Sequence, residues 1–567
     1  MKNIRIFVEN EARAILENLT SDLVAEMPQA EVKEFITEVI DDVIENRIDP
    51  KSLQGQPSPQ VLYGVNVICS YDPDSNPVVH ENTPTVSNLL GSVEPEFIGN
   101  GQMVTNYRGI RAGALVHADG GYLILDAYDV LSEPGSWRLL MRALRTGSVE
   151  IVPSDLGWPL IKQSLKPQAI DISVRIILIG SSRLYYQLDQ VDQDFTNLFK
   201  ALADFNSEIE RSALGINQYA AVVARICRDE DLVQFNASGV AALAEHGGRI
   251  ASRKGKITAR FGRIADIVRE ASFLATKAGA ALVGRKHVEE TIIRNKYRAS
   301  LPSTRFQELI HDGTIMVQTR GSVVGQINGL AVINAGQLNY GFPARITATI
   351  GAGRAGVIDI EGAAALSGAI HTKGFHILGG LLRHLLHSDH PLAFSASIAF
   401  EQSYGGIDGD SASGAEICCL ISALTGVPIR QGLAMTGSID QHGHIQAIGA
   451  VNEKIERFFD ACKSMGLNDE QGIIIPWSNA GDLMLRPDVV EACAAGHFQI
   501  HAVKNVNEAL EVLTGKEAGK PGSDGKYPDD SLLGLAQLKA TEFWRKTMNR
   551  PERIQSADAE TQEHRIR

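Results

Sequence analysis

The sequence predicts a multidomain α/β protein, and three features of the chain lead to this prediction. Strand-like and helix-like segments alternate over residues 60–215, which is typical of an α/β domain with a largely parallel sheet. Residues 217–296 have the apolar spacing of helices throughout, and a Gly-rich pattern of short strands with at least three helices covers residues 317–515. The length of 567 residues suffices for three or four domains of about 150 residues each.

Composition and charge restrict the partners and the compartment. The chain has 54 Lys and Arg against 67 Asp and Glu, and this net charge of −13 argues against nucleic acid or an anionic membrane as the main partner. The six cysteines, of which Cys418 and Cys419 are adjacent and the other four scattered, form no CxxC pair, so we expect neither a disulfide framework nor a structural zinc site. Because no segment resembles a signal peptide or a membrane span, we expect a cytoplasmic protein with reduced thiols.

The first fifty residues predict helices, since one run of apolar side chains follows the helical i, i+3, i+4 spacing. We expect this stripe to pack against a neighbouring helix. A Gln/Pro/Ser-rich stretch ends the segment, which gives an N-terminal helical region over residues 1–55. The residues of the stripe are Val32, Phe35, Ile36, Val39, Ile40, Val43 and Ile44.

The α/β domain is expected over residues 56–215. Its predicted strands are 61–63, 65–68, 122–125, 149–152 and 174–179, and its clearest predicted helix is 136–144. The run 174–179 is almost continuously apolar, which suits a strand buried on both faces.

A helical subdomain is expected over residues 216–300, with turns at Gly247-Gly248 and Ala278-Gly279. The remaining boundaries predict a linker over 301–316, a second α/β domain over 317–515 and a C-terminal region over 516–567. This last region is predicted to contain a flexible Gly-rich linker at 515–525, an amphipathic helix over 531–548 and a polar tail.

Nucleotide-binding motifs are missing or lack the required context. Residues 351–356 fit GxGxxG, but strand-like residues follow where that motif needs a helix, so we predict a hairpin turn. No segment fits the phosphate-binding pattern GxxxxGK[ST]. Residues 120–126 look like a Walker B strand, yet Ala127 stands where an ATPase usually places a glutamate. We therefore expect no cofactor and no site for ATP hydrolysis.

A candidate nucleophile, Ser411, lies in the run GDSASG at 409–414. Residues 394–400 before it are strand-like and residues 415–424 after it are helical, so Ser411 is predicted at a helix N-terminus. Free backbone N–H groups at such a position can stabilise an oxyanion. Since Ser and Asp are also common helix caps, this pattern alone leaves a purely structural role open.

Two kinds of base are available to such a serine. Lys454 is flanked by apolar residues, and burial would lower its pKa until the neutral amine could accept a proton. The flanking residues are Ile448, Val451 and Ile455. Alternatively, Lys454 could extend its head group into water, and a histidine from a nearby cluster could act with an aspartate. The histidines of the cluster are His371, His376, His384, His387 and His390.

Residues 316–515 resemble the proteolytic domain of Lon proteases, through several motifs in the same order. These are GDSAS at 409–413, AMTGSI at 434–439 and IGAVNEK at 448–454, with similar flanks IHTKG at 370–374 and GIIIP at 472–476. The intervals also agree, with 25 residues from Ser411 to Thr436 and 43 from Ser411 to Lys454. The form of the nucleophile motif is most similar to LonB-like and LonC-like members.

This resemblance implies an α+β proteolytic domain with a Ser–Lys dyad. Ser411 would be the nucleophile and Lys454 the general base, and the peptide would be cleaved through an acyl-enzyme. Thr436 matches the threonine that helps to orient the lysine. Asp408 and Asp410 match acidic positions beside the nucleophile in some members.

The upstream region resembles, more weakly, the degenerate AAA+ module of Lon-related proteins. The similar segments are 111–127 and 177–205, and Arg260 and Arg263 lie where an AAA+ module carries its sensor arginine. The missing phosphate-binding motif and Walker B glutamate resemble the LonC-like group, in which the module is a scaffold and proteolysis does not depend on ATP.

The resemblance implies an ATP-independent serine endopeptidase that degrades unfolded polypeptides inside a homohexameric ring. Substrate is expected to add to a strand edge near residues 394–401. No metal, nucleic acid or membrane is expected to take part. Two alternatives stay open, a non-catalytic ring that holds unfolded chains and an ATP-dependent protease whose nucleotide site lies in a longer precursor or a partner chain.

Overall fold

The computed structural model describes residues 2–48, 57–71, 76–98, 102–153, 165–335, 338–523 and 525–548. It divides the chain into two compact units, Met1–Phe205 (unit 1) and Asn206–Arg567 (unit 2). None of the helices in the described ranges combines the length and the apolar character that crossing a membrane requires. All six cysteines are free.

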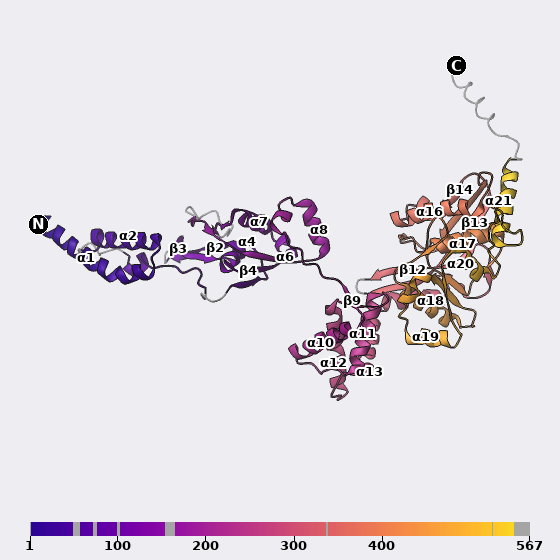
Figure 1. The fold of residues 1–567 in the computed structure, drawn as a ribbon, viewed down its shortest axis with the longest axis horizontal. Helices are drawn as coiled ribbons and strands as arrows, with labels where there is room; N and C mark the ends of the chain where they lie inside the picture. Colours follow the sequence, from indigo (N-terminus) through magenta and orange to yellow (C-terminus); the bar gives the residue numbers. More distant parts are fainter. Residues whose placement is uncertain are drawn as a thin grey trace, which may run out of the picture. The chain divides into compact units, whose positions relative to one another are not determined.

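Two helices form the N-terminal segment: α1 (Lys2–Glu26) and α2 (Ala30–Asn46). They pack against each other, as the stripe predicted (Figure 1). Ile36, Ile40 and Ile44 of α2 are buried, and Leu16 of α1 packs on them. Phe35 was expected in this face but is 42% exposed, because it lies one residue, or about 100° of helical turn, before Ile36.

A three-stranded parallel sheet with the order β1-β4-β8 forms the centre of the α/β part of unit 1. Its strands are β1 (Val78–Glu81), β4 (Tyr122–Asp126) and β8 (Arg175–Ile179). Leu123 and Leu125 point into a core that Leu140 shares. On the opposite face Ile177 and Ile179 are exposed. The prediction that this last strand is buried on both faces is therefore wrong, because β8 is an edge strand in a sheet with one open face.

Smaller helices and further strands make up the rest of unit 1. They are α3 (Pro59–Leu62), α4 (Val86–Leu90), α5 (Ala114–His117), α6 (Ala127–Ser132), α7 (Ser136–Thr146), α8 (Ser182–Val191), α9 (Phe195–Leu198), β2 (Gly91–Ile98), β3 (Gln102–Ala112), β5 (Ser148–Val149), β6 (Val152–Pro153) and β7 (Ile170–Asp171). Residues 61–63 were predicted as strand but lie mostly in α3, where Pro59 at the first turn favours a helix. Residues 65–68 form no strand, and the predicted strand 149–152 is split between β5 and β6.

Four helices form the subdomain that opens unit 2: α10 (Ala213–Asp229), α11 (Ala237–Ala251), α12 (Phe261–Lys277) and α13 (Arg285–Arg298). A short strand pair, β9 (Glu208–Glu210) and β10 (Lys256–Thr258), lies beside them. The turn at Gly279 occurs as predicted, whereas Gly247 and Gly248 lie inside α11. A Cβ at Gly247 would come within 2.6 Å of Tyr219 Oη, so this glycine allows close helix packing and does not mark a turn.

The predicted linker 301–316 is mostly a helix, α14 (Leu301–His311). Pro302 lies in its first turn, where the missing N–H costs nothing. Ile310 is buried, and the ring of Phe306 packs 5.0 Å from that of Phe342. The segment is therefore packed onto the second α/β part of the chain.

A seven-stranded mixed sheet with the order β14-β15-β13-β12-β17-β20-β21 forms the centre of that part. Its strands are β12 (Gln326–Ala335), β13 (Leu338–Ala352), β14 (Gly356–Asp359), β15 (Phe394–Phe400), β17 (Leu433–Met435), β20 (Gly472–Pro476) and β21 (Gln499–Val503). β12, β17, β20 and β21 are parallel, while β13 runs antiparallel to both β12 and β15. With 10 and 15 residues, β12 and β13 are longer than the short strands that we expected.

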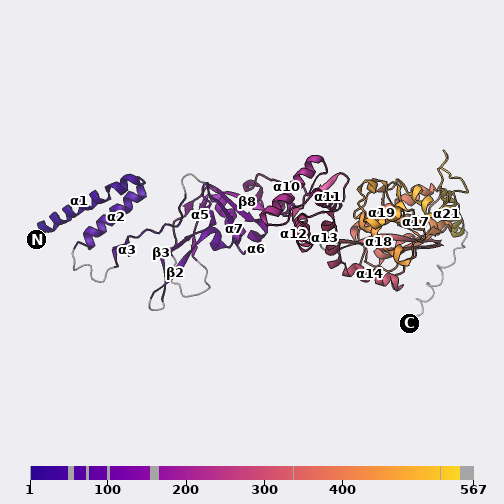
Figure 2. The same ribbon diagram turned by 90° about the horizontal axis from the view of Figure 1, so that it is seen from below.

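Helices cover both faces of this sheet (Figures 1 and 2). One face carries α16 (Ala369–Leu386), α17 (Ser413–Thr425), α20 (Val506–Thr514) and α21 (Leu532–Met548), and the other carries α18 (Val451–Met465) and α19 (Pro487–Ala494). Successive residues of β20 show this arrangement, since Ile474 packs in the first core while Ile473 and Ile475 pack in the second.

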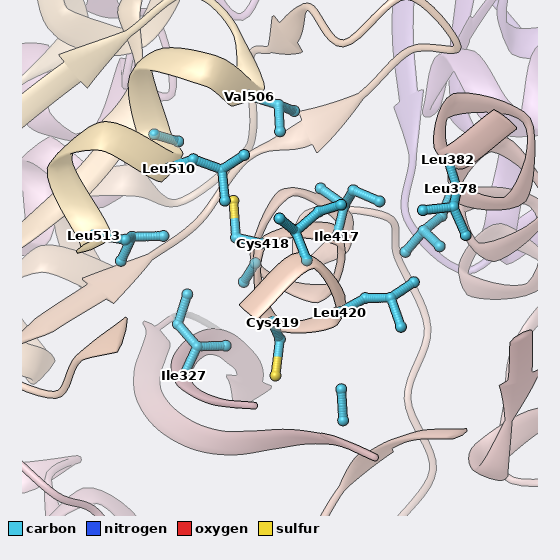
Figure 3. Close-up of a cluster of buried hydrophobic side chains, with 14 of the residues drawn as sticks. Ile327, Leu378, Leu382, Ile417, Cys418, Cys419, Leu420, Val506, Leu510 and Leu513 are labelled. Atoms are coloured by element: carbon cyan, nitrogen blue, oxygen red, sulfur yellow. The ribbon is translucent and has the colours of Figure 1, made fainter. Parts of the chain in front are cut away.

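α17 is buried on all sides, as Figure 3 shows. Its side chains Ile417, Cys418, Cys419 and Leu420 point outward in different directions, between α16 and α20. A helix that is apolar all round belongs in the middle of a core. The adjacent cysteines therefore act as small apolar side chains here.

Shorter elements complete unit 2. They are β11 (Ser322–Val323), α15 (Ile360–Ala363), β16 (Ile429–Arg430), β18 (Ser438–Ile439), β19 (Ile445–Gln446) and the 3₁₀ helix Trp477–Asp482. The GxGxxG segment at 351–356 joins β13 to β14, as a strand-to-strand connection. It is not the hairpin that we predicted, because β15 lies between these two strands and pairs with both.

The predicted flexible linker at 515–525 is packed where the structure describes it. Ala518 is fully buried, and its carbonyl accepts a hydrogen bond of 3.0 Å from the amide of Leu533. α21 appears as predicted, and Leu533 and Ala536 join the core around α17. This core thus extends beyond residue 515, where we had expected the domain to end. The polar tail from 549 onward lies outside the described residues.

Candidate active site

Ser411, Thr436 and Lys454 meet at the carboxyl end of β17. Thr436 follows β17 directly, Ser411 comes two residues before α17, and Lys454 lies in the first turn of α18. Since α17 and α18 cover opposite faces of the sheet, the site forms where the two layers meet beyond a strand end. This is a common place for ligand sites in sheets with parallel strands.

The side chains of these residues form a continuous hydrogen-bonded chain. Lys454 Nζ lies 2.8 Å from Ser411 Oγ and 3.0 Å from Thr436 Oγ1. The Thr436 hydroxyl donates its own proton to the carbonyl of Ser411 over 3.1 Å. Its oxygen is therefore free to accept from Lys454, which fixes the amine beside the serine hydroxyl.

Burial changes the acidity of Lys454. The residue is only 3% exposed, so it does not extend its head group into water as the alternative reading required. Desolvation lowers the pKa of Lys454 to about 8, against a smaller opposing effect from the charge of Asp410. At that pKa about a tenth of the amine is neutral at pH 7, compared with less than about 0.1% for an ordinary lysine.

Close backbone packing holds the turn that carries Ser411. The amide of Gly437 donates to the carbonyl of Ser411 over 2.7 Å, and the amide of Gly414 donates to that of Gly437 over 2.9 Å. A Cβ at Gly414 would lie 2.9 Å from the backbone carbonyl oxygen of Gly437, so this close approach requires glycine. The amides of Ser411 and Ala412 donate to no atom of the described residues, and they are available to an oxyanion.

The two acidic neighbours have different partners. Asp410 accepts a hydrogen bond of 3.2 Å from Ser438 Oγ, and its charge acts on Lys454. Asp408 accepts from the amides of Gly409, Ile370 and His371 at 2.9, 3.0 and 3.3 Å. These bonds, that of Gly409 foremost, hold the pKa of Asp408 below its usual range. Asp408 thus anchors the loop to the start of α16.

None of the five clustered histidines forms a hydrogen bond with Ser411. His371 is buried beside Asp359 and Glu416, at 3.7 and 3.9 Å. His390 stacks on Trp544 with ring centroids 4.8 Å apart. The geometry therefore supports lysine and not histidine as the neighbour of the serine.

The structure contradicts the expected docking strand. β15 covers residues 394–400 and pairs with β14 on one side and β13 on the other. It therefore has no free edge to which a substrate strand could add. The edge strands of this sheet are β14 and β21.

Sequence reasoning missed Gly341, which positions α18. A Cβ at Gly341 in β13 would lie 2.4 Å from the carbonyl oxygen of Glu453 and 2.9 Å from Lys454 Cα. No motif signals this contact, because it depends on how the sheet and α18 pack. A buried group around Asp359 and Glu361, described below, was missed for the same reason.

α18 also contacts the helical subdomain. Arg249 of α11 forms a two-pronged ion pair with Glu456 at 2.6 and 2.8 Å, and both side chains are largely buried. Beside this pair lies a cavity of about 640 Å³ that Arg263 and Lys296 also line. The predicted sensor-like Arg263 thus faces a cavity within unit 2.

The Walker B-like aspartate has a structural partner of its own. Asp126 caps α6, since its carboxylate accepts from the amides of Tyr128 and Asp129 at 2.8 and 3.3 Å. Ala127, at the position of the usual glutamate, is buried.

Comparisons with known proteins agree with this architecture. Residues 74–206 match the LonB-like AAA domain, residues 234–298 match the LID domain of the archaeal LonB AAA+ ATPase, and residues 402–515 match the C-terminal proteolytic domain of Lon protease.

Relatives cover most of the chain. A Lon protease homolog of Haemophilus influenzae is 32% identical over 428 residues, which are 75% of this chain and 70% of the relative. One of Escherichia coli is 30% identical over 408 residues, 71% of this chain and 68% of the relative. An archaeal Lon protease of Thermococcus kodakarensis is 29% identical over 317 residues, 56% of this chain and 46% of the relative. With an AAA-like domain followed by a Lon proteolytic domain, the chain belongs to the Lon protease family.

Proposed function

We propose that this chain is an ATP-independent serine endopeptidase that degrades unfolded polypeptides through a Ser–Lys dyad. The observation that carries the proposal is the 2.8 Å contact between the buried amine of Lys454 and Ser411 Oγ. A lysine with a lowered pKa beside a serine at a helix N-terminus has the properties of a general base and its nucleophile.

The proposed reaction has two halves. Neutral Lys454 takes the hydroxyl proton as Ser411 Oγ attacks the peptide carbonyl, and the amides of Ser411 and Ala412 stabilise the oxyanion. The Lys454 ammonium then gives its proton to the leaving amine, and an acyl-enzyme ester remains. In the second half Lys454 deprotonates a water molecule that attacks the ester, which releases the new carboxyl terminus and restores Ser411.

Thr436 and Asp410 support this chemistry in different ways. Thr436 accepts from Lys454 and so keeps the amine directed at the serine. The charge of Asp410 favours the ammonium form of Lys454, which is the form that appears as the serine is attacked. Asp410 therefore stabilises the charge that develops while it keeps the pKa from falling further.

Independence from ATP is supported by the state of the AAA-like domain. The chain has no GxxxxGK[ST] motif, and Asp126 is engaged as a helix cap. In this proposal residues 56–215 and 216–300 act as scaffold and residues 317–515 carry the catalysis. Assembly as a homohexamer in the cytoplasm, with active sites facing an inner chamber, is part of the same proposal and is based on the family resemblance.

An ATP-dependent protease is the second candidate. The matches to a LonB-like AAA domain and to an AAA+ ATPase LID domain favour it. Its nucleotide would be held with the help of a longer chain or a partner. The hydrogen-bonded dyad argues against the third possibility, a ring that only holds unfolded chains.

The deciding experiment measures cleavage of unfolded, fluorescently labelled casein by the full chain, with and without ATP and Mg²⁺. We expect cleavage without nucleotide, and its loss in Ser411→Ala and Lys454→Met. Lys463→Met is the matched control, because Lys463 lies on the same helix with its side chain 60% exposed. Cleavage only with ATP would favour the second candidate, and casein binding without cleavage would favour the holding ring.

A further inference from the structure

A second group of reactive side chains lies apart from the dyad, where β14, α15 and α16 come together. Asp359 ends β14, Glu361 lies in α15 and His371 lies in the first turn of α16. One potential ligand atom from each of the three lies within 4.8 Å of the other two. Glu361 and His371 are only 4% and 2% exposed, so this is an interior cluster.

The polar atoms of this cluster are poorly satisfied. Glu361 Oε1 accepts from the amide of Phe400 over 2.8 Å, but Oε2 is buried with no hydrogen-bond partner among the described residues. The ring nitrogens of His371 lie 3.7 Å from Asp359 Oδ2 and 3.9 Å from Glu416 Oε1, which is beyond hydrogen-bond range. Buried polar atoms without partners are rare in folded proteins, and a bound ion or water is one physical explanation for them.

The cluster also brings several carboxyl groups together without a basic side chain beside them. Glu416 of α17 is also buried and faces His371, with its Oε1 atom 3.9 Å from Nδ1 of that ring. Across the described part of the chain, no lysine or arginine forms an ion pair with Asp359, Glu361 or Glu416. A bound cation would give these carboxyl groups a positively charged partner.

We propose that Asp359, Glu361 and His371 bind a divalent transition-metal cation of the Zn²⁺ class. Two carboxylates and one imidazole form a donor set that such ions accept. Ligand atoms around tetrahedral zinc lie about 3.3 Å apart, so His371 Nε2 and Asp359 Oδ2, now 3.7 Å apart, need to approach by only a few tenths of an ångström. His371 Nδ1 would then face Glu416, as the second nitrogen of a metal-binding histidine commonly faces a carboxylate.

A cation at this position would join four elements of the fold. It would bind β14, α15 and α16 directly, and would reach α17 through Glu416, which lies in the first turn of that helix five residues after Ser411. The role that follows is structural, since the metal would hold together the starts of α16 and α17 on either side of the Asp408 anchor. The dyad itself lies outside this ligand set.

The test uses the full chain, freed of metal by a chelator and then dialysed. Zn²⁺ is titrated by calorimetry, and thermal unfolding is measured with and without one equivalent of Zn²⁺. We expect one tight site per chain and a higher unfolding midpoint with Zn²⁺. Glu361→Gln and Asp359→Asn should each weaken binding at least about tenfold. Asp469→Asn is the matched control, because Asp469 forms an exposed pair with His497 at 2.6 Å.

Three outcomes would overturn the proposal: no stoichiometric binding, binding by Glu361→Gln as tight as in the wild type, or a loss of binding in Asp469→Asn. If Zn²⁺ leaves the unfolding midpoint unchanged, protons alone neutralise the cluster and the proposal is wrong. Asp359→Asn serves as the deciding variant if circular dichroism shows that Glu361→Gln is misfolded. Ser411→Ala should bind Zn²⁺ like the wild type, which separates this site from the dyad.

Discussion

Titration of Lys454 should control the rate at which a substrate acylates Ser411. Burial lowers the pKa of Lys454 to about 8. The neutral fraction is then about 1% at pH 6, about 9% at pH 7, about 50% at pH 8 and about 90% at pH 9. The acylation rate should therefore rise almost tenfold per pH unit below pH 7 and level off above pH 8.5, for a total increase of about 90-fold.

The assay is single-turnover cleavage of a fluorogenic peptide that has no titratable groups, with folding checked by circular dichroism at each pH. An ordinary lysine would give a rise of about a thousandfold between pH 6 and 9 with no plateau, and an ordinary histidine only about a fourfold rise. A midpoint near pH 6.5, or a rate still climbing tenfold per unit at pH 9, would refute the assignment of a buried lysine base.

Asp410→Asn tests the same titration by removing the negative charge that acts on Lys454. The charge of Asp410 raises the pKa of Lys454, so its removal should move the midpoint of the rate profile to lower pH. The maximal rate should also fall, because the ammonium that forms during attack loses a stabilising charge. A midpoint that moves to higher pH would contradict the electrostatic role of Asp410.

Three further predictions concern α18. Lys454→Arg should retain less than about 1% of the peptidase rate, because a guanidinium stays protonated, while Lys463→Arg should cleave the same peptide normally. Gly341→Ala should displace α18 and lower kcat by on the order of a hundredfold with little change in KM, since its Cβ would lie 2.4 Å from the carbonyl of Glu453. Glu456→Ala should cost about 3 kcal/mol in denaturant unfolding, because the buried Arg249 loses its bidentate partner and keeps only the longer 3.7 Å pair with Glu453, and an unchanged midpoint would contradict that role.

Helices that depend only on the spacing of neighbouring residues could be predicted from the sequence. The stripe of α2, the helix α7 and the amphipathic α21 appear where the apolar spacing placed them, since a helical period needs only neighbouring residues. The candidate residues Ser411, Thr436 and Lys454 could also be named from motifs and intervals. The contact between these three side chains could not be predicted, because it depends on the packing of α17 and α18 on opposite faces of one sheet.

Errors arose where long-range pairing decides the structure. The sequence does not indicate that β15 lies between β13 and β14. The prediction of a hairpin at 351–356 and that of a free strand edge near 394–401 were therefore both wrong. β8 is as apolar as a fully buried strand, yet its neighbours leave one face open. Gly247 suggested a turn because glycine is common in turns. In the structure, glycine is needed at this position because the hydroxyl of Tyr219 leaves no room for a Cβ.

α18 makes two contacts whose combination has a mechanical consequence. Lys454 reaches the serine from one side of the helix, and Glu456, two residues or about 200° further round, binds Arg249 of the helical subdomain on the other. A helix is stiff over two residues, so the positions of Arg249 and of the Lys454 amine are coupled through α18. In the proposed reaction, misplacing the Lys454 amine by about 1 Å would lower the rate by on the order of a hundredfold. The ion pair between Arg249 and Glu456 thus fixes α18 from the side opposite Lys454, so the helical subdomain helps to hold the proposed general base in place.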